Sequence, residues 1–145
     1  MTDRLKGKVA LISGGATGMG GAASELFAAE GAAVAIVDRN LGEAQATAAR
    51  ITAAGHRAIA ITADVSDAVQ VSAAVDQATA ELGPITVLFN HAGTIVIKPF
   101  QETTEQDWDW LHSVNVKSMV LMTRAVLCRL WPARSNAWSK PRLKN

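Results

Sequence analysis

A glycine-rich segment near the start of the chain has the composition of a turn that binds phosphate. It runs from Ser13 to Gly20, between an apolar run typical of a buried strand and an alanine-rich stretch typical of a helix. Glycines let backbone approach a ligand closely, and the free N–H groups at a helix start attract phosphate. Gly21 and Ala22 stand where a nucleoside-triphosphate loop needs Lys and Ser or Thr. The turn therefore predicts a phosphate-bearing ligand that is held by backbone N–H groups at the helix start and not by the side chains of a nucleoside-triphosphate loop.

An acidic residue after the next apolar run adds a second signal. Asp38 ends the predicted strand 33–37, where a carboxylate can accept hydrogen bonds from a ribose diol. The turn alone also fits a structural role, because glycines permit tight turns, but turn, helix and acid together predict a dinucleotide. Asp38 would repel a 2′-phosphate, whereas the neighbouring Arg39 can accommodate one. We predict NAD as the cofactor, with NADP as the less favoured alternative.

The elements that must position these residues alternate regularly. A strand-like run is followed by a helix-like stretch four times, with short connections. This order predicts an α/β fold: a Rossmann-type doubly wound parallel sheet with strand order 3-2-1-4, truncated after the fourth strand and the helices that follow it. The expected strands are 9–12, 33–37, 57–63 and 85–89.

Polar residues mark the expected helix starts. Asn40 is a candidate cap, with Glu43 placed to complete a capping box, and Ser66 is the candidate cap of the next helix. Thr103 and Gln106 are expected to form a further capping box. The last helix is expected to carry one continuous face, formed by Val116, Met119, Val120, Thr123, Val126, Leu127 and Leu130.

Composition excludes several classes of protein. The net charge of +1 gives no general nucleic-acid footprint, and no apolar run approaches membrane-spanning length. The stretch from Met1 to Lys8 is too polar for a signal peptide. Cys128 is the only cysteine, so the chain can form no internal disulfide, which suits a cytoplasmic protein. The histidines lie apart from any cysteine or acidic cluster, so no metal site is expected.

The charge balance shifts sharply near the C-terminus. Segment 129–145 holds basic residues and no acidic one. A segment whose composition switches in this way is typically not part of the same folded unit. We therefore expect an incomplete dinucleotide-binding domain over residues 1–128 and a basic irregular tail over residues 129–145.

From about residue 5 to residue 127 the chain resembles the classical short-chain dehydrogenases/reductases, which are NAD(P)-dependent Rossmann-fold oxidoreductases. Their Thr-Gly-x-x-x-Gly-x-Gly turn is similar to the segment 13–20, and their adenine-contacting acid is similar to Asp64, which Val65 follows. Their Asn-Asn-Ala-Gly motif is similar to the segment 90–93, and their catalytic helix Asn is similar to Asn115. The expected cofactor contacts are Ser13, Gly14, Gly18, Met19, Gly20, Asp38, Arg39, Asp64, Val65, Asn90, Ala92 and Gly93.

One residue departs from the family pattern. His91 stands where the family has its second Asn, which helps to hold the strand backbone beneath the nicotinamide end of the cofactor. A ring nitrogen of histidine could do the same. We expect a passive or structural role for His91 rather than acid–base chemistry.

The resemblance also implies chemistry that this sequence does not complete. In the family, a Ser and a Tyr-x-x-x-Lys motif move a proton while hydride passes between the nicotinamide and an alcohol or ketone. This sequence holds no tyrosine, so Asn115 is the one catalytic residue expected. The change of composition near Cys128 favours a frameshift or premature stop over a genuine short paralogue.

Several functions remain open at this point. The first is an oxidoreductase of this family, present here as a cofactor-binding portion without turnover. The alternatives are a non-catalytic nucleotide-binding portion and an interaction fragment. In the last, an uncovered fourth strand and last helix would drive self-association. Neither nucleic acid nor a membrane is an expected partner.

Overall fold

The structure has one sheet of four parallel strands: β1 (Val9–Ser13), β2 (Ala33–Asp38), β3 (Ala58–Thr62) and β4 (Val87–Asn90). It is a computed structural model that describes residues 3–130. The strand order is β3-β2-β1-β4, which confirms the predicted fold class and topology. β1 and β2 are therefore the inner strands of the described sheet, and β3 and β4 are its edges.

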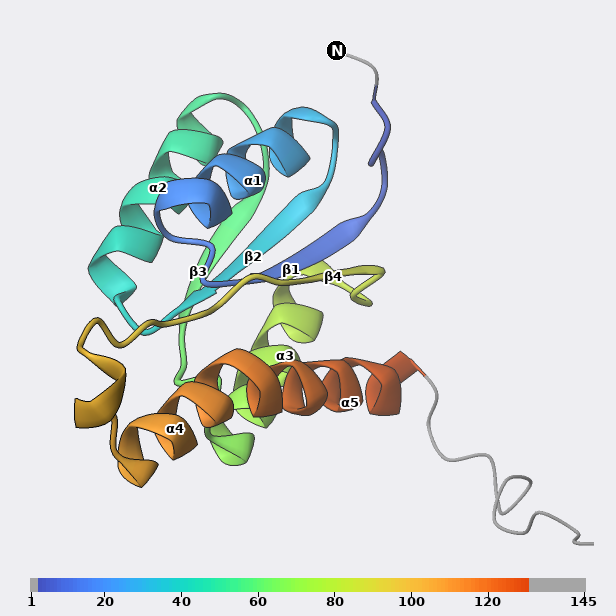
Figure 1. Cartoon of the computed structure of the whole chain (residues 1–145). Coiled ribbons are helices and arrows are strands. Elements are labelled where there is room, and N and C mark those ends of the chain that lie inside the picture. Colours follow the sequence, from blue (N-terminus) through green and yellow to red (C-terminus); the bar gives the residue numbers. More distant parts are fainter. Residues whose placement is uncertain (1–2, 131–145) are drawn as a thin grey trace, which may run out of the picture.

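Helices cover both faces of this sheet (Figure 1). The helices are α1 (Gly18–Ala29), α2 (Leu41–Ala53), α3 (Ala68–Leu82), α4 (Glu105–His112) and α5 (Ser118–Leu130). α1 and α2 lie on one face, and α3 and α5 lie on the other. A 3-10 turn, η1 (Phe100–Glu102), precedes α4, and a π-helical turn, η2 (Ser113–Lys117), joins α4 to α5.

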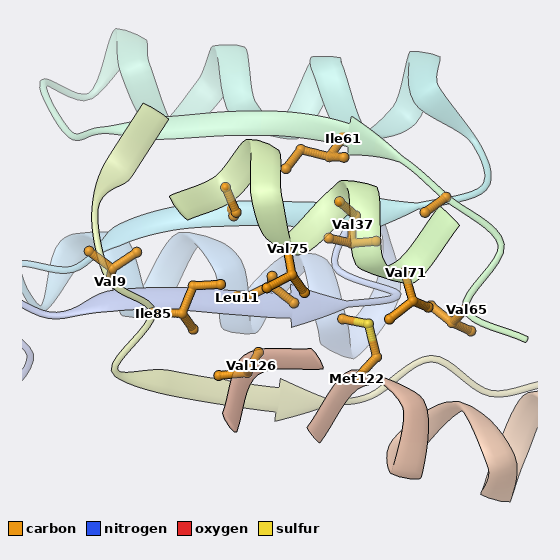
Figure 2. Close-up of a cluster of buried hydrophobic side chains, with 14 of the residues drawn as sticks. Val9, Leu11, Val37, Ile61, Val65, Val71, Val75, Ile85, Met122 and Val126 are labelled. Atoms are coloured by element: carbon orange, nitrogen blue, oxygen red, sulfur yellow. The ribbon is translucent and has the colours of Figure 1, made fainter. Parts of the chain in front are cut away.

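Two apolar cores form because the inner strands are buried on both sides. Leu11 of β1 belongs to the core beneath α3 and α5, whereas its neighbours Ala10 and Ile12 face α1 and α2. Figure 2 shows the first of these cores, where Leu11 gathers with Val75 of α3 and Met122 of α5. The continuous apolar runs of the sequence reflect this two-sided burial.

The predicted N-cap is confirmed for α2 but not for α3. Asn40 caps α2 as predicted, since its side chain accepts a hydrogen bond from the Glu43 N–H at 3.2 Å. The prediction of Ser66 as a cap is wrong. Asp67 caps α3 instead, by accepting from two N–H groups of the first turn. Ser66 donates its hydroxyl to the carboxylate of Asp64, so it serves the preceding loop.

The predicted capping box of α4 is displaced by one residue. Thr104, not Thr103, is the N-cap, and its side chain accepts from the Asp107 N–H. Asp107, not Gln106, completes the box by accepting from the Thr104 N–H at 2.8 Å. A carboxylate in the first turn also complements the helix dipole, which an amide does less well.

α5 does not bury the continuous face that the sequence marks, but lies on the sheet by another side. The buried positions from η2 into α5 are Val114, Ser118, Met122 and Val126, spaced four residues apart. Of the predicted stripe, only Val126 is buried. Apolar residues lie on both sides of this helix, and Ser118 on the buried side is satisfied by donating to the Val114 carbonyl. Because Ser118 is polar, the apolar pattern of the sequence does not mark the face that packs on the sheet.

The predicted end of the domain falls inside α5. This helix continues past residue 128 to Leu130, and Arg129 bonds to Asp76 and Ser72 of α3. The remainder of the predicted tail, 131–145, lies outside the described residues. Across residues 3–130, no helix combines the length and the apolar character that a membrane span requires.

Candidate functional site

Two adjoining hollows open at the carboxyl ends of β1, β2 and β4. The larger has a volume of about 600 Å³ and is lined by Gly14, Asp38, His91 and Asn115, among others. The smaller, of about 120 Å³, shares Gly14 and Asp38 and extends to Asp64. In open α/β sheets this carboxyl edge is where ligands bind. The fold thus gathers residues from every predicted motif at one edge.

The glycine turn is shaped by two different demands. Gly14 and Gly18 have φ angles of +65° and +55°, which favour glycine. A Cβ on Gly14 would also stand 2.8 Å from the Cα of Ala92. Gly18 has open space around it, whereas a Cβ on Gly20 would collide with the Gly14 carbonyl. Close packing therefore constrains Gly14 and Gly20, and backbone conformation constrains Gly18.

Ser13 joins the turn to the end of β4. Its buried hydroxyl oxygen accepts hydrogen bonds from the His91 N–H at 3.1 Å and the Ala92 N–H at 3.2 Å. A single side chain therefore satisfies two backbone donors where the ladder between β1 and β4 ends. These two hydrogen bonds fix the start of the segment from Ala92 to Gly93, which lines both hollows.

Asp38 links the turn to the start of α2. One carboxylate oxygen accepts from the Ala16 N–H at 3.3 Å, and the other accepts from the Asn40 N–H at 3.0 Å. Each oxygen has a further lone pair, so the carboxylate can accept two more bonds from a ligand. Arg39 lines the smaller hollow beside it.

The loop after β3 supplies the far wall of the smaller hollow. Asp64 accepts from both the hydroxyl and the N–H of Ser66, and these bonds hold the pKa of the Asp64 carboxyl below its ordinary value. Val65 lines the hollow and is buried in the core with α3. The acid is therefore charged and fixed in place near neutral pH.

Two asparagines support the segment after β4. The side chain of Asn115 accepts from the Thr94 N–H at 2.7 Å and donates to the Thr94 carbonyl at 2.9 Å. Asn90 donates to the Thr123 hydroxyl at 3.3 Å, and its carbonyl oxygen is buried without a hydrogen-bond partner in the described part of the chain. Asn115 sits in the π-helical turn, a feature that is frequent at functional sites.

The family model described as short chain dehydrogenase matches residues 8–137. The chain belongs to the short chain dehydrogenase family. The chain spans about half the length of the curated relatives it matches. D-threitol dehydrogenase of Mycolicibacterium smegmatis is 41% identical over 136 residues, which are 92% of this chain and 52% of that protein. Cyclopentanol dehydrogenase of Comamonas testosteroni is 38% identical over 124 residues, covering 86% and 50% of the two chains.

Solved structures of the same family share this fold. A dehydrogenase/reductase from Sinorhizobium meliloti superposes with a TM-score of 0.83 at 37% identity, over 87% of this chain and 50% of that one. A blue fluorescent protein from a metagenomic library, solved in complex with NADPH, has a TM-score of 0.80 at 37% identity, over 86% and 51% of the two chains. The short chain dehydrogenase fold therefore extends over the four-stranded sheet described here.

The sequence motifs missed some of the residues that line the two hollows. Thr17, Thr94 and Ile95 line the larger hollow. Thr17 lies within the turn, and the other two follow directly after the segment 90–93, so adjacency to a motif was the only available signal. Met19, a predicted contact, stands exposed in the first turn of α1.

Proposed function

We propose that this chain binds a nicotinamide dinucleotide and is the cofactor-binding portion of an oxidoreductase that acts on small alcohols or ketones. The observation that carries this proposal is the convergence of the glycine turn, Asp38 and the segment 90–93 on adjoining hollows. The N–H groups at the start of α1, from Gly18 to Gly20, would hold the diphosphate. The carboxylate of Asp38 would hold the adenosine ribose, with Asp64 and Val65 beside the adenine.

In this proposal the residues of the chain position the cofactor and do not carry out proton transfer. When bound, the nicotinamide would supply the carbon that gives or takes a hydride. Asn115 fixes Thr94 through both atoms of its amide and so shapes the wall of the larger hollow. The 145 residues hold no tyrosine. We therefore propose that this chain alone binds cofactor without turnover.

We propose NAD(H) over NADP(H). The free lone pairs of Asp38 suit two ribose hydroxyls, and a 2′-phosphate would meet a negative charge. Two observations favour the opposite choice: Arg39 lies beside Asp38, and one structural neighbour holds NADPH. Titration of both reduced cofactors by fluorescence distinguishes them. We expect NADH to bind about tenfold more tightly, and Asp38→Ser to remove that difference. Tighter NADPH binding by the parent chain would reverse the proposal.

The names of the relatives support a proposal for the substrate class. Two of them are named for a polyol and for a cyclic alcohol, so we propose a small secondary alcohol and its ketone as substrates of the intact enzyme. The measurement is nicotinamide absorbance at 340 nm, a property of the reduced cofactor, with a panel of such alcohols and ketones. We expect none to raise the rate above background. Saturable turnover that disappears in Asn115→Ala would show that another group replaces the tyrosine.

A second candidate function is an interaction fragment. Met119, Val120 and Leu127 form an exposed apolar face on α5, together with a shallow hollow that also includes Cys128. Exposed patches of this kind mark association surfaces. Sedimentation with and without NADH separates the two candidates, because association without cofactor binding favours this one. The single unpaired cysteine supports a reducing, cytoplasmic location under either.

A further inference from the structure

His91 lies against the first turn of α1. Its ring stacks on Phe89, with ring centroids 5.4 Å apart and an interplanar angle of 27°. Its Cδ2 atom is 2.6 Å from the point where a Cβ on Gly20 would stand, so the ring occupies the space that glycine leaves free. Its backbone N–H is held by Ser13. Both the backbone and the ring are therefore fixed next to the helix start.

The ring nitrogens of His91 are available to a ligand. Neither nitrogen bonds to a protein group within residues 3–130, and His91 is among the residues that line the larger hollow. The stacking on Phe89 restricts the ring to one plane and so lowers the entropic cost of using it as a donor.

The charges around His91 leave room for an anion. The first turn of α1 carries no acidic residue, the β1 residue that contacts the His91 backbone is the uncharged Ser13, and Gly14 follows it in the lining of the hollow. Among the residues that line the larger hollow, Asp38 is the other charged group, and Asn115 from η2 is neutral. Both oxygens of Asp38 already accept backbone N–H bonds. The positive end of α1 and an imidazolium would thus face one common space.

We propose that the protonated imidazole of His91 contacts the diphosphate of the dinucleotide, so that cofactor binding takes up a proton. The inference rests on the proposed function, because it requires the dinucleotide to lie on the turn. The diphosphate would neutralise both the partial positive charge at the start of α1 and the charge of the ring. Without the anion, both positive charges remain uncompensated. An imidazole ordinarily changes charge between pH 5 and 8, whereas carboxylates ordinarily change at lower pH. The two contributions therefore separate in a pH profile.

The test is the dissociation constant of NAD⁺ measured by calorimetry from pH 5.5 to pH 8.5, where the charge of its diphosphate is constant. For the 145-residue chain we expect binding to weaken about three- to tenfold across this range. His91→Asn, which installs the residue of the family motif, should vary less than about twofold. His56→Asn is the matched control. His56 lines a separate hollow of about 330 Å³ that contains none of the predicted site residues, so its replacement should leave the parent slope unchanged.

A second measurement does not depend on a variant folding. Calorimetry of the parent chain near pH 6.5, in two buffers with different heats of ionisation, reports the protons taken up on binding. Uptake of a substantial fraction of one proton supports the proposal. Equal slopes for the parent and His91→Asn, or no uptake, would overturn the role of His91 alone. No NAD⁺ binding at any pH would overturn the proposed function and this inference together.

Discussion

The inner strands β1 and β2 with α1 and α2 form a well-packed region, which we call the closed region. The part of the chain from β4 onward, which we call the open region, is less buried. Every residue of β1 is buried, but all four residues of β4 are only half-buried. Of the fourteen large apolar side chains that the described structure exposes, ten follow Asn90. The phosphate-binding turn thus rests on the well-packed region. The wall opposite it rests on few buried anchors, chiefly Met122 and Val126.

The largest expected effect is a loss of unfolding free energy from a substitution at the centre of the sheet, compared with the same substitution on the exposed face of α5. Leu11 is completely buried, so Leu11→Ala should cost about 3 kcal/mol of unfolding free energy through lost burial and the cavity left behind. Leu127 of α5 is 55% exposed, and Leu127→Ala should change stability by less than about 0.5 kcal/mol. Urea denaturation followed by circular dichroism measures both. Equal losses at the two positions would show that the exposed face of α5 is covered in solution.

The second effect concerns the turn. Gly20→Ala places a Cβ against the Gly14 carbonyl, so backbone must move, at a cost of about 2 kcal/mol. NADH binding should weaken as well, because the helix start shifts. Gly42→Ala is the control. A Cβ there meets only the Asn40 side chain at 3.6 Å, and alanine favours a helix. A Gly20→Ala chain that keeps the stability and affinity of the parent would contradict this role.

The sequence predicted the closed region better than the open one, for a physical reason. Strands buried on both faces have continuous apolar runs, and the glycine turn needs residues that few other structures require, so β1, α1 and β2 were readily predicted. Gly20 was predicted as a ligand contact, but the lack of room for a Cβ beside the Gly14 carbonyl depends on how two segments approach each other. Residue types within one segment do not determine that distance.

The third effect tests the bond that joins the two regions. Ser13→Ala leaves the N–H groups of His91 and Ala92 without an acceptor, which should cost about 1–2 kcal/mol. Ser13→Thr keeps the hydroxyl and matches the family motif, so it should remain within about 0.5 kcal/mol of the parent. The urea midpoint measures both. If the Ala and Thr variants are equally stable, the hydroxyl does not hold β4 to β1.

The open region shows what local patterns leave undetermined. α5 is apolar on two sides, and only packing against α3 and the sheet decides which side is buried. Likewise, Thr103 and Thr104 are equal candidates for a cap by residue type. Asp107 decides between them, because its carboxylate bonds to Thr104 and pairs with Lys98 from the preceding segment. A rule based on residue spacing within one helical turn does not include Lys98, which lies nine residues before Asp107.

The smallest effect follows from that same carboxylate and depends on pH. Hydrogen bonds from Lys98 and then Thr104 lower the pKa of Asp107 to about 2 in the folded chain, from an ordinary value of 3.8. Because the folded-state pKa lies below the unfolded one, the stabilisation is complete above about pH 4 and is lost as the pH falls toward 2. Asp107→Asn should therefore lower the melting temperature modestly at pH 6 and converge with the parent near pH 2. Asp64, Asp67 and Asp76 also have lowered pKa values and contribute a shared acid slope to both chains, so the difference between the chains isolates Asp107.

Asp109→Asn is the matched control for this last prediction. Asp109 lies on the same helix, and its side chain has no hydrogen-bond or ion-pair partner within residues 3–130. Its replacement should leave the acid profile of the parent unchanged. A parent-minus-Asp107→Asn difference that stays constant from pH 6 to pH 2 would mean that Lys98 does not hold the segment after β4 against α4. The open region would then depend on its buried apolar side chains and on the hydrogen bonds of Ser13, Asn115 and Arg129, without a contribution from Lys98.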